Sequence, residues 1–345
     1  MKPLFQKLKE KKIKCLACSH YCHLSPGQVG ICGVRENQGG KLISLVAGKA
    51  VGMGLDPVEK KPLFHFLPGS QVLSFGTLGC NFRCLFCQNW FQSQSPKGKT
   101  QEERRLLIDQ YSQPFSPQEI VSLAVENGIS SIAYTYNEPT VFIEYALETM
   151  TLAKKKGIKN IWVSNGFLSR ESFARVKGLI DGINIDLKSF REEFYQEICG
   201  GQLKPVLENI KRFFRAGVWI EVTTLVIPGK NSSSRELKQI AKFLKDISPD
   251  IPWHITAFYP QYKMTHLPPT SPETLRKAWE IGKEEGLKFV YVGNIVDSQR
   301  STTFCPACGA ELIRRDGYQV EIEKLDLQKE CCSVCGEKVP GRWQK

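Results

Sequence analysis

Twelve of the thirteen cysteines in this sequence fall into three groups, and the spacing within each group limits its chemistry. The middle group has three members, Cys80, Cys84 and Cys87, in a C-x3-C-x2-C pattern. Thiolates hold zinc ions and iron–sulfur clusters, and a four-iron cube with three cysteine ligands leaves one iron open. An open position distinguishes a catalytic metal from a structural one. The middle group is therefore the first candidate for a reactive site.

Two other interpretations of the middle group are open at this point. Zinc could take a fourth ligand from elsewhere in the chain, or an electron-transfer cluster could use Cys199, the one cysteine outside the groups. Cys199 could equally be a small buried residue, because free cysteine packs well in protein cores.

The C-terminal group contains two C-x2-C-G knuckles, which predict a zinc ribbon because two such knuckles close a tetrahedral four-sulfur site. Its predicted zinc ligands are Cys305, Cys308, Cys332 and Cys335. Rubredoxin-like iron is the alternative, and the adjacent Cys331 is interpreted as a spare thiol.

The N-terminal group follows a C-x2-C-x3-C-x9-C spacing, which also indicates a metal site. Its members are Cys15, Cys18, Cys22 and Cys32. Spacing does not decide between zinc and a second iron–sulfur cluster. We expect zinc, since no electron path is visible in the sequence.

The elements that must position these groups form a regular pattern from about residue 70 onward. Runs rich in β-branched and aromatic residues span 71–77, 131–136, 160–165, 182–187, 219–226, 253–258 and 289–293. Helical segments lie between them, and two begin with a serine N-cap followed by proline, at Ser116 and Ser271. This alternation predicts an α/β fold with a parallel sheet, as a partial (β/α) barrel or a doubly wound sheet. Ligands of both architectures sit at the carboxyl ends of the strands, where the middle cysteines lie.

Composition and net charge restrict the possible functions less than the cysteine spacing does. The formal charge of +12 could suit an anionic partner such as nucleic acid. Metal-bound thiolates would lower this charge to about +7, so a nucleic-acid partner is not favoured. The sequence shows neither a long apolar span nor a signal peptide, so we expect a cytoplasmic protein with no membrane association.

Residues 10–300 resemble a known family in the order and content of their motifs. The motifs are "DPVEKKPLFHFLPG", "FGTLGCNFRCLFCQNW", "TYNEPT", "SNGF", "NIDLKSF", "TTLVIPG", "PWHITAFYPQYKM" and "YVGN". They resemble the AmmeMemoRadiSam system radical SAM enzymes, which are related to the pyruvate formate-lyase activating enzymes. The resemblance implies a partial barrel of six to seven parallel strands at 63–298. A Cys-rich metal-binding module would occupy 1–62, and a zinc-ribbon-like module 299–345.

The resemblance also implies roles for individual residues. Cys80, Cys84 and Cys87 would bind a [4Fe-4S] cluster whose fourth iron is chelated by S-adenosylmethionine (SAM). The residues implied to contact SAM are Phe86, Gln88, Asn137, Glu138, Asn165, Asp186, Lys188 and His254. Three of these have plain structural alternatives. Glu138 could be a solvated loop carboxylate, Lys188 could form a salt bridge with Asp186, and His254 could be a hydrogen-bonded core residue.

Three hypotheses about function follow. The leading one is a radical SAM enzyme that cleaves SAM reductively and abstracts hydrogen from a substrate, in the manner of the activases that act on proteins. The second keeps this chemistry but acts on RNA or a small metabolite, and the third is a non-catalytic zinc or iron–sulfur scaffold. The resemblance implies a reductant such as flavodoxin or ferredoxin, and AMMECR-like and Memo-like partner proteins.

Overall fold

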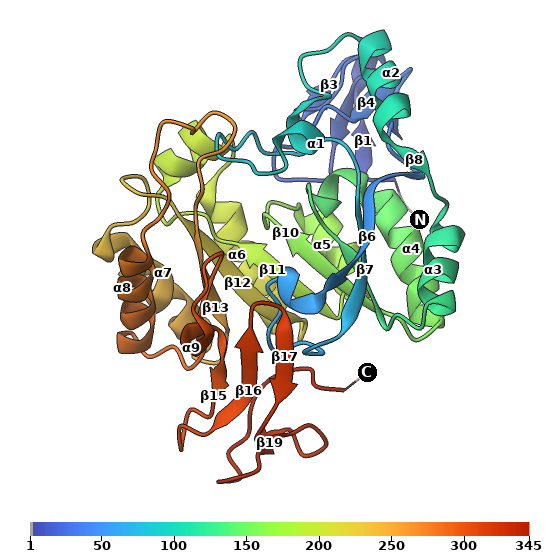
Figure 1. Cartoon of the computed structure of the whole chain (residues 1–345). Coiled ribbons are helices and arrows are strands. Elements are labelled where there is room, and N and C mark those ends of the chain that lie inside the picture. The colour runs from blue at the N-terminus through green and yellow to red at the C-terminus, as the bar shows by residue number, and fades with distance from the viewer. Residues whose placement is uncertain (1–2, 345) are drawn as a thin grey trace.

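A nine-stranded, mainly parallel sheet organises the computed structural model, which describes residues 3–344 (Figure 1). In spatial order its strands are β14 (Val290–Gly293), β13 (Trp253–Ala257), β12 (Trp219–Val226), β11 (Gly182–Asp186), β10 (Lys159–Ser164), β9 (Ser131–Tyr134), β7 (Gln71–Gly76), β6 (Lys49–Pro57) and β8 (Gln113–Pro114). The seven strands from β7 to β14 are mutually parallel, and β6 and β8 are added antiparallel at one edge.

All seven predicted strands are present in this sheet. Their spatial order follows the chain from β7 to β14, whereas a doubly wound sheet would reverse direction at a switch point. The α/β class and the parallel sheet are therefore confirmed. Closure of the sheet into a partial barrel stays a prediction.

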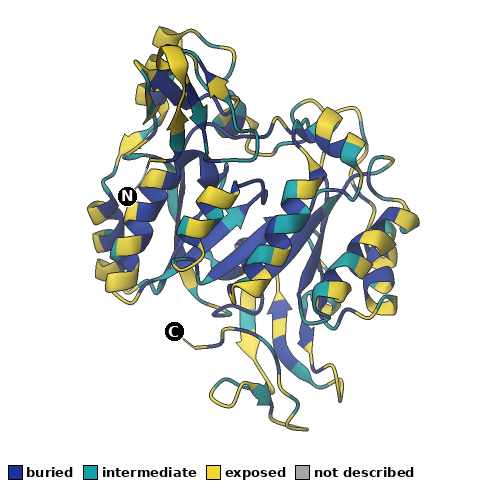
Figure 2. Ribbon diagram, turned by 180° about the vertical axis from the view of Figure 1, so that it is seen from behind, coloured by how far each residue is buried: buried dark blue, intermediate teal, exposed yellow. Residues whose placement is uncertain are grey.

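Helices connect the parallel strands and cover the sheet. They are α3 (Pro117–Glu126), α4 (Ile143–Lys155), α5 (Arg170–Val176), α6 (Leu203–Arg215), α7 (Ser234–Ile247) and α8 (Pro272–Glu284), with short turns η3 (Pro139–Phe142) and η4 (Phe194–Cys199). Both predicted start signals are confirmed, because the hydroxyls of Ser116 and Ser271 cap α3 and α8. Figure 2 shows the helices with exposed outer faces around a buried sheet.

The N-terminal region forms small elements above one end of the sheet (Figure 1). They are β1 (Phe5–Lys7), η1 (Lys9–Lys11), β2 (Ile13–Cys15), β3 (His23–Leu24), β4 (Arg35–Gln38) and β5 (Lys41–Ser44), and α1 (Trp90–Gln94) and α2 (Gln101–Tyr111) lie beside them. The strand β6, within the predicted module 1–62, pairs with β7 in the main sheet. The division into modules stays a prediction, and the pairing of β6 with β7 joins the first two modules in one sheet.

The C-terminal region is a ribbon of short strands at the opposite end (Figure 1). It contains α9 (Ser298–Ser301), β15 (Thr303–Phe304), β16 (Glu311–Asp316), β17 (Gln319–Ile322), β18 (Leu325–Asp326) and β19 (Cys331–Cys332). Buried hydrogen bonds fix the ribbon to the segment that follows η2 (Val58–Lys60). The Arg315 guanidinium donates to the Phe64 carbonyl at 2.6 Å, and His65 Nδ1 donates to the Pro340 carbonyl at 2.8 Å.

None of the helices between residues 3 and 344 has the length and apolarity needed to cross a bilayer.

Candidate functional site

The three cysteines of the middle group lie on the wall of one cavity of about 510 Å³. This volume lies within the range of about 300–1,000 Å³ that is typical of small-molecule sites. The cavity opens at the carboxyl ends of the parallel strands, and every one of the seven strands contributes to it. Its polar lining includes Thr135, Tyr136, Asn137, Ser164, Asn165, Asp186, Lys188, Thr223, Thr256 and Asn294. The cavity therefore lies where the sequence predicts a ligand site, at the carboxyl ends of the parallel strands.

The loop after β7 is held so that its cysteines face this cavity. It begins at Gly79, whose φ of +89° suits glycine, and where a Cβ would lie 2.7 Å from the Cys32 carbonyl oxygen. Burial is the main cause that raises the pKa of the Cys80 and Cys87 thiols. Beside Cys80, the Asn81 Nδ2 is buried and has no hydrogen-bond partner among the described residues. Three thiols and an unpaired N–H fit a metal–sulfur group, whose sulfur atoms can accept that hydrogen bond.

Cys199 lies next to this loop, which the sequence alone did not predict. The amides of Arg83 and Leu85 donate to the carbonyls of Cys199 and Ile198, at 2.7 and 3.0 Å. The Cys199 thiol is the main cause that raises the pKa of the Cys84 thiol, with burial second. Cys199 is fully buried and does not line the cavity, so its position supports a packing role more than a ligand role.

Glu138 does not occupy the position implied for it. Its carboxylate is fully buried, lies outside the cavity lining, and accepts hydrogen bonds from its own chain. Oε1 accepts from the Thr140 amide at 3.1 Å and Oε2 from the Asn165 amide at 2.8 Å, while the Ser164 hydroxyl contacts both oxygens. Burial raises the pKa of Glu138, against the effect of these donors. Glu138 is therefore placed to brace Ser164 and Asn165, and a direct contact with SAM stays a prediction.

Asn137 and Asn165 do line the cavity, and their side chains tie it to the cysteine loop. The Asn137 Nδ2 donates to the Gly79 carbonyl at 2.7 Å, and the Asn165 Nδ2 donates to the Asn81 Oδ1 at 2.7 Å. Two neighbouring strand ends are thus coupled to the residues that flank Cys80.

An ion pair crosses another part of the wall. The Lys188 ammonium lies 2.8 Å from the Asp186 carboxylate and 5.7 Å from the centre of the Phe86 ring. Burial opposes the charge of Lys188, but Asp186 and the nearby thiols raise its pKa well above the ordinary value. All three residues and the exposed Gln88 line the cavity. A zwitterionic ligand with an aromatic base could bind here, with its charged groups against Lys188 and Asp186 and its base against the Phe86 ring.

His254 is not brought to the cysteine cavity. It is buried, and its Nε2 lies 2.6 Å from the Glu221 Oε2. Glu221 also accepts from the amides of Phe64 and His65 at 2.9 and 2.8 Å, and from the Trp219 indole at 2.9 Å. These hydrogen bonds fit the structural alternative of a core residue, but His254 also lines the cavity that adjoins the first, so its contact with SAM stays a prediction.

A second cavity of about 770 Å³ adjoins the first. The two cavities share the lining residues Lys60, Pro62, Thr256, Asn294 and Tyr318. Tyr318 lies in the turn between β16 and β17, so the C-terminal ribbon forms part of the wall. Sequence reasoning missed this contribution because a ribbon with its own metal spacing predicts an independent module.

A buried charge cluster also faces the first cavity and was missed. Lys61 lines the cavity, and its ammonium lies 2.6 Å from Asp56 Oδ2, which also accepts from the Tyr136 hydroxyl at 2.7 Å. The motif "DPVEKK" contains Asp56 and Lys61, and only the fold places Tyr136 beside them.

The flanking cysteine groups differ in compactness. The sulfur atoms of Cys305, Cys308, Cys332 and Cys335 all lie within 4.8 Å of one another, with contacts of 3.6 and 3.8 Å. A tetrahedral zinc site with bonds of about 2.3 Å places its sulfurs about 3.8 Å apart. This group therefore has the dimensions of the predicted zinc site. The four N-terminal cysteines surround a small enclosed cavity.

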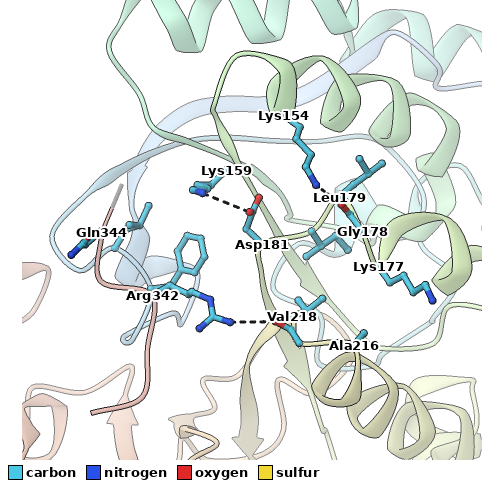
Figure 3. Close-up of a pocket in the computed structure, with 14 residues that line it drawn as sticks. Lys154, Lys159, Lys177, Gly178, Leu179, Asp181, Ala216, Val218, Arg342 and Gln344 are labelled. Carbon is cyan, nitrogen blue, oxygen red and sulfur yellow. Dashed lines mark hydrogen bonds and ion pairs between the residues drawn. The ribbon is translucent and has the colours of Figure 1, made fainter. Parts of the chain in front are cut away.

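A further cavity of about 230 Å³ lies at the amino-terminal ends of β10 to β12 (Figure 3). Its cations are engaged with the chain: Lys154 donates to the Gly178 carbonyl at 2.7 Å, and Lys159 lies 4.0 Å from Asp181. Residues at this end of a parallel sheet usually serve stability.

Comparison with known proteins identifies the class. The profile of the radical SAM superfamily matches residues 75–244, which include the cysteine loop and the strands through β12. These residues form a radical SAM domain. This superfamily is defined by iron–sulfur and SAM binding, and its members use a [4Fe-4S] cluster.

This chain resembles two proteins in sequence and one solved structure in fold. It is 39% identical to the uncharacterized protein MJ0808 of Methanocaldococcus jannaschii, over 97% of each chain. It is 23% identical to the pyruvate formate-lyase 1-activating enzyme of Escherichia coli, over 65% of this chain and 93% of that one. The solved structure of Streptococcus suis SuiB bound to S-adenosylmethionine shares the fold, with a TM-score of 0.51 and 12% identity over 76% of this chain and 65% of that one.

Proposed function

We propose that this protein is a radical SAM enzyme of the activating-enzyme type, within the AmmeMemoRadiSam group that its motifs resemble. The observation that carries the proposal is the placement of Cys80, Cys84 and Cys87 on a cavity lined by the ends of all seven parallel strands. When bound there, a [4Fe-4S] cluster supplies the electron that cleaves SAM to methionine and a 5′-deoxyadenosyl radical, which abstracts a substrate hydrogen.

The residues of this chain bind and orient the reactants. The three thiolates would hold the cluster, and the buried Asn81 Nδ2 beside Cys80 would be free to donate a hydrogen bond to it. Lys188 pairs with the SAM carboxylate while Asp186 accepts from the SAM ammonium, because each side chain offers the opposite charge at the cavity wall. The Phe86 ring packs against the adenine base. The part of the wall formed by Cys80, Cys84 and Phe86 is buried, which limits the access of water from that side.

The adjoining cavity supports a bulky substrate. Bound SAM occupies the first cavity, and the 770 Å³ of the second remains for the group that is attacked. Its walls combine Val292, Ile295 and Tyr259 with the acidic Asp297 and Asp316. Lys60 lines the same cavity and Arg300 pairs with Asp297, so charge alone does not select the substrate; the resemblance to the activating enzymes leads us to favour a protein segment over RNA. A small metabolite would leave much of this space unfilled.

The proposed enzyme needs partners of stated kinds. A one-electron donor such as flavodoxin or ferredoxin would reduce the cluster, and AMMECR-like and Memo-like proteins are the proposed associates of the system.

The deciding experiment measures 5′-deoxyadenosine after anaerobic reconstitution with iron and sulfide, followed by dithionite and SAM. Wild type should produce it, and Cys84→Ala should not. Cys331→Ala is the matched control, because Cys331 lies outside both the cavity and the four-sulfur group. If wild type forms no 5′-deoxyadenosine, or if Cys84→Ala matches it, the enzyme proposal fails and the non-catalytic scaffold is favoured.

A further inference from the structure

The buried charge cluster beside the cysteine cavity contains a cation that the proposed contacts with SAM do not use. Lys61 is 2% exposed, and it lines the cavity. Its ammonium lies 2.6 Å from Asp56 Oδ2 and 4.8 Å from the centre of the Tyr136 ring. We propose that Lys61 binds a carboxylate of the substrate and thereby positions, next to SAM, the group that loses hydrogen.

The ammonium of Lys61 has more hydrogen-bond donors than the chain satisfies. An ammonium carries three N–H groups, and Asp56 provides the one acceptor that the described residues offer to it. The face of the Tyr136 ring attracts the cation but provides no oxygen acceptor. Burial lowers the pKa of Lys61 despite the hydrogen bond to Asp56, because water no longer solvates the charge. An anionic acceptor in the cavity would satisfy the remaining N–H groups and stabilise the buried cation.

Asp56 does not serve Lys61 alone. Its Oδ1 accepts from the Lys60 ammonium at 2.7 Å, and its Oδ2 also accepts from the Tyr136 hydroxyl at 2.7 Å. Burial opposes the charge of Asp56, but the hydrogen bonds from Lys60, Lys61 and Tyr136 lower its pKa, so it is a carboxylate. One carboxylate is therefore shared by two lysines, of which Lys60 is half exposed and Lys61 is buried. Water screens the charge of Lys60, whereas Lys61 depends on partners inside the protein.

The position of Lys61 suits a substrate group. Its neighbours Lys60 and Pro62 line both cavities, so Lys61 lies close to the junction between them. The Pro62 carbonyl accepts from the Asn184 Nδ2 at 2.7 Å, which fixes this segment against β11. SAM has one carboxylate, and the proposed function assigns it to Lys188. A second carboxylate at Lys61 therefore belongs to the substrate.

The other cations of the two cavities indicate how much negative charge the site accepts. Binding of RNA needs several cations along the phosphate chain. The other lysines on the two walls are Lys60 and Lys188, which pair with Asp56 and Asp186. The walls thus offer one buried ammonium with free donors, which fits a single carboxylate better than a chain of phosphates. This role, which rests on the proposed function, narrows the substrate to a protein segment that carries a carboxylate near the reacting carbon.

The test measures peptide binding to the full-length, reconstituted protein with SAM bound. The probes are acetyl-Gly-Glu-Gly-amide, acetyl-Gly-Gly-Gly with a free carboxyl end, and the neutral acetyl-Gly-Gln-Gly-amide. Wild type should bind one of the two carboxylate peptides about tenfold more tightly than the neutral peptide. The tighter of the two shows whether the carboxylate comes from a side chain or from a chain end.

Lys61→Met should abolish this preference and leave the affinity for SAM unchanged. Asp56 keeps Lys60 and Tyr136 as partners in this variant, so its carboxylate is not left unpaired. Lys60→Met is the matched control, because it removes an ammonium from the same carboxylate at a half-exposed position, and it should keep the preference. A purely structural role of Lys61 would alter stability without changing the ratio between the carboxylate and neutral peptides.

Four outcomes would overturn the proposal. They are no preference for a carboxylate in wild type, a preference that survives in Lys61→Met, a SAM affinity that falls in Lys61→Met, and tighter binding of a uridine trinucleotide than of either carboxylate peptide. The wild-type comparison decides even where Lys61→Met fails to fold. A carboxylate preference in a wild type that forms no 5′-deoxyadenosine would refute the proposed function and leave the binding site standing, and the reverse result would refute the site alone.

Discussion

Replacing Glu138 with glutamine should destabilise the fold and weaken SAM binding together. Each carboxylate oxygen of Glu138 accepts one backbone N–H, from Thr140 at Oε1 and from Asn165 at Oε2. A glutamine amide offers one oxygen, so whichever way it turns, one buried N–H loses its acceptor. That loss costs about 1–3 kcal/mol of unfolding free energy. The side chain keeps its size, so no cavity is created.

The effect on function depends on which way the glutamine amide turns. If its nitrogen faces Asn165, the Asn165 amide loses its acceptor, and Asn165 lines the cysteine cavity. About 1.4 kcal/mol lost at that position corresponds to a tenfold weaker affinity for SAM. The fall in stability should therefore be accompanied by a higher dissociation constant, with the iron content unchanged.

Denaturant unfolding and SAM titration of reconstituted protein measure both effects. Glu148→Gln is the matched control, because Glu148 lies on the exposed face of α4 and the chemical change is the same. A variant at Glu138 that loses SAM affinity but keeps its unfolding free energy would refute the bracing role and restore a direct contact. Unchanged values of both quantities would show that the carboxylate does neither.

Three further predictions concern pH, charge and metal. Burial lowers the pKa of His65 to about 4, so only the unfolded chain binds its proton between about pH 6.5 and 4. The free energy of unfolding should fall by up to about 3 kcal/mol as pH drops through this window, and the fall due to His65 should be absent in His65→Gln. The prediction is wrong if the unfolding free energies of wild type and variant change with pH in parallel. Lys188→Met should weaken SAM binding about tenfold while cluster iron is retained, because the ammonium that would pair with the SAM carboxylate is lost. An unchanged SAM titration would argue against this pairing. Cys308→Ser should remove about one zinc per chain and lower the melting temperature of the ribbon, as elemental analysis and calorimetry can show; full zinc retention would reject the site.

The parallel strands were predictable because each is a short β-branched run that is buried on both faces, such as 219–226. β6 was missed because Gly52 and Gly54 interrupt its apolar pattern, and glycine weakens a strand signal. Its position at the antiparallel edge depends on pairing with β7, which no local pattern records.

Ligands of parallel α/β folds sit at the carboxyl ends of the strands, and this rule predicted the position of the candidate site. It did not predict the orientation of side chains that is set by hydrogen bonds to residues behind the cavity wall. The rule correctly placed Asp186 and Lys188 at the cavity. It could not separate Asn137, which faces the cavity, from Glu138, whose carboxylate turns away to accept from the nearby Thr140 amide and from the Asn165 amide after β10. For His254, the deciding partner is Glu221, a buried strand carboxylate that carries no motif.

The docking of the ribbon has a consequence for how the protein is made. His65 contacts Pro340 across 275 positions of sequence, and Phe66 forms a bridge with Arg342. A ribosome adds about 5–20 residues per second, so the segment that ends near the cavity waits for many seconds before its partners emerge. During this interval the cysteine loop has already been synthesised while one wall of its cavity is missing. Biosynthesis thus provides a period in which iron and sulfide can reach the loop before the last residues close the molecule.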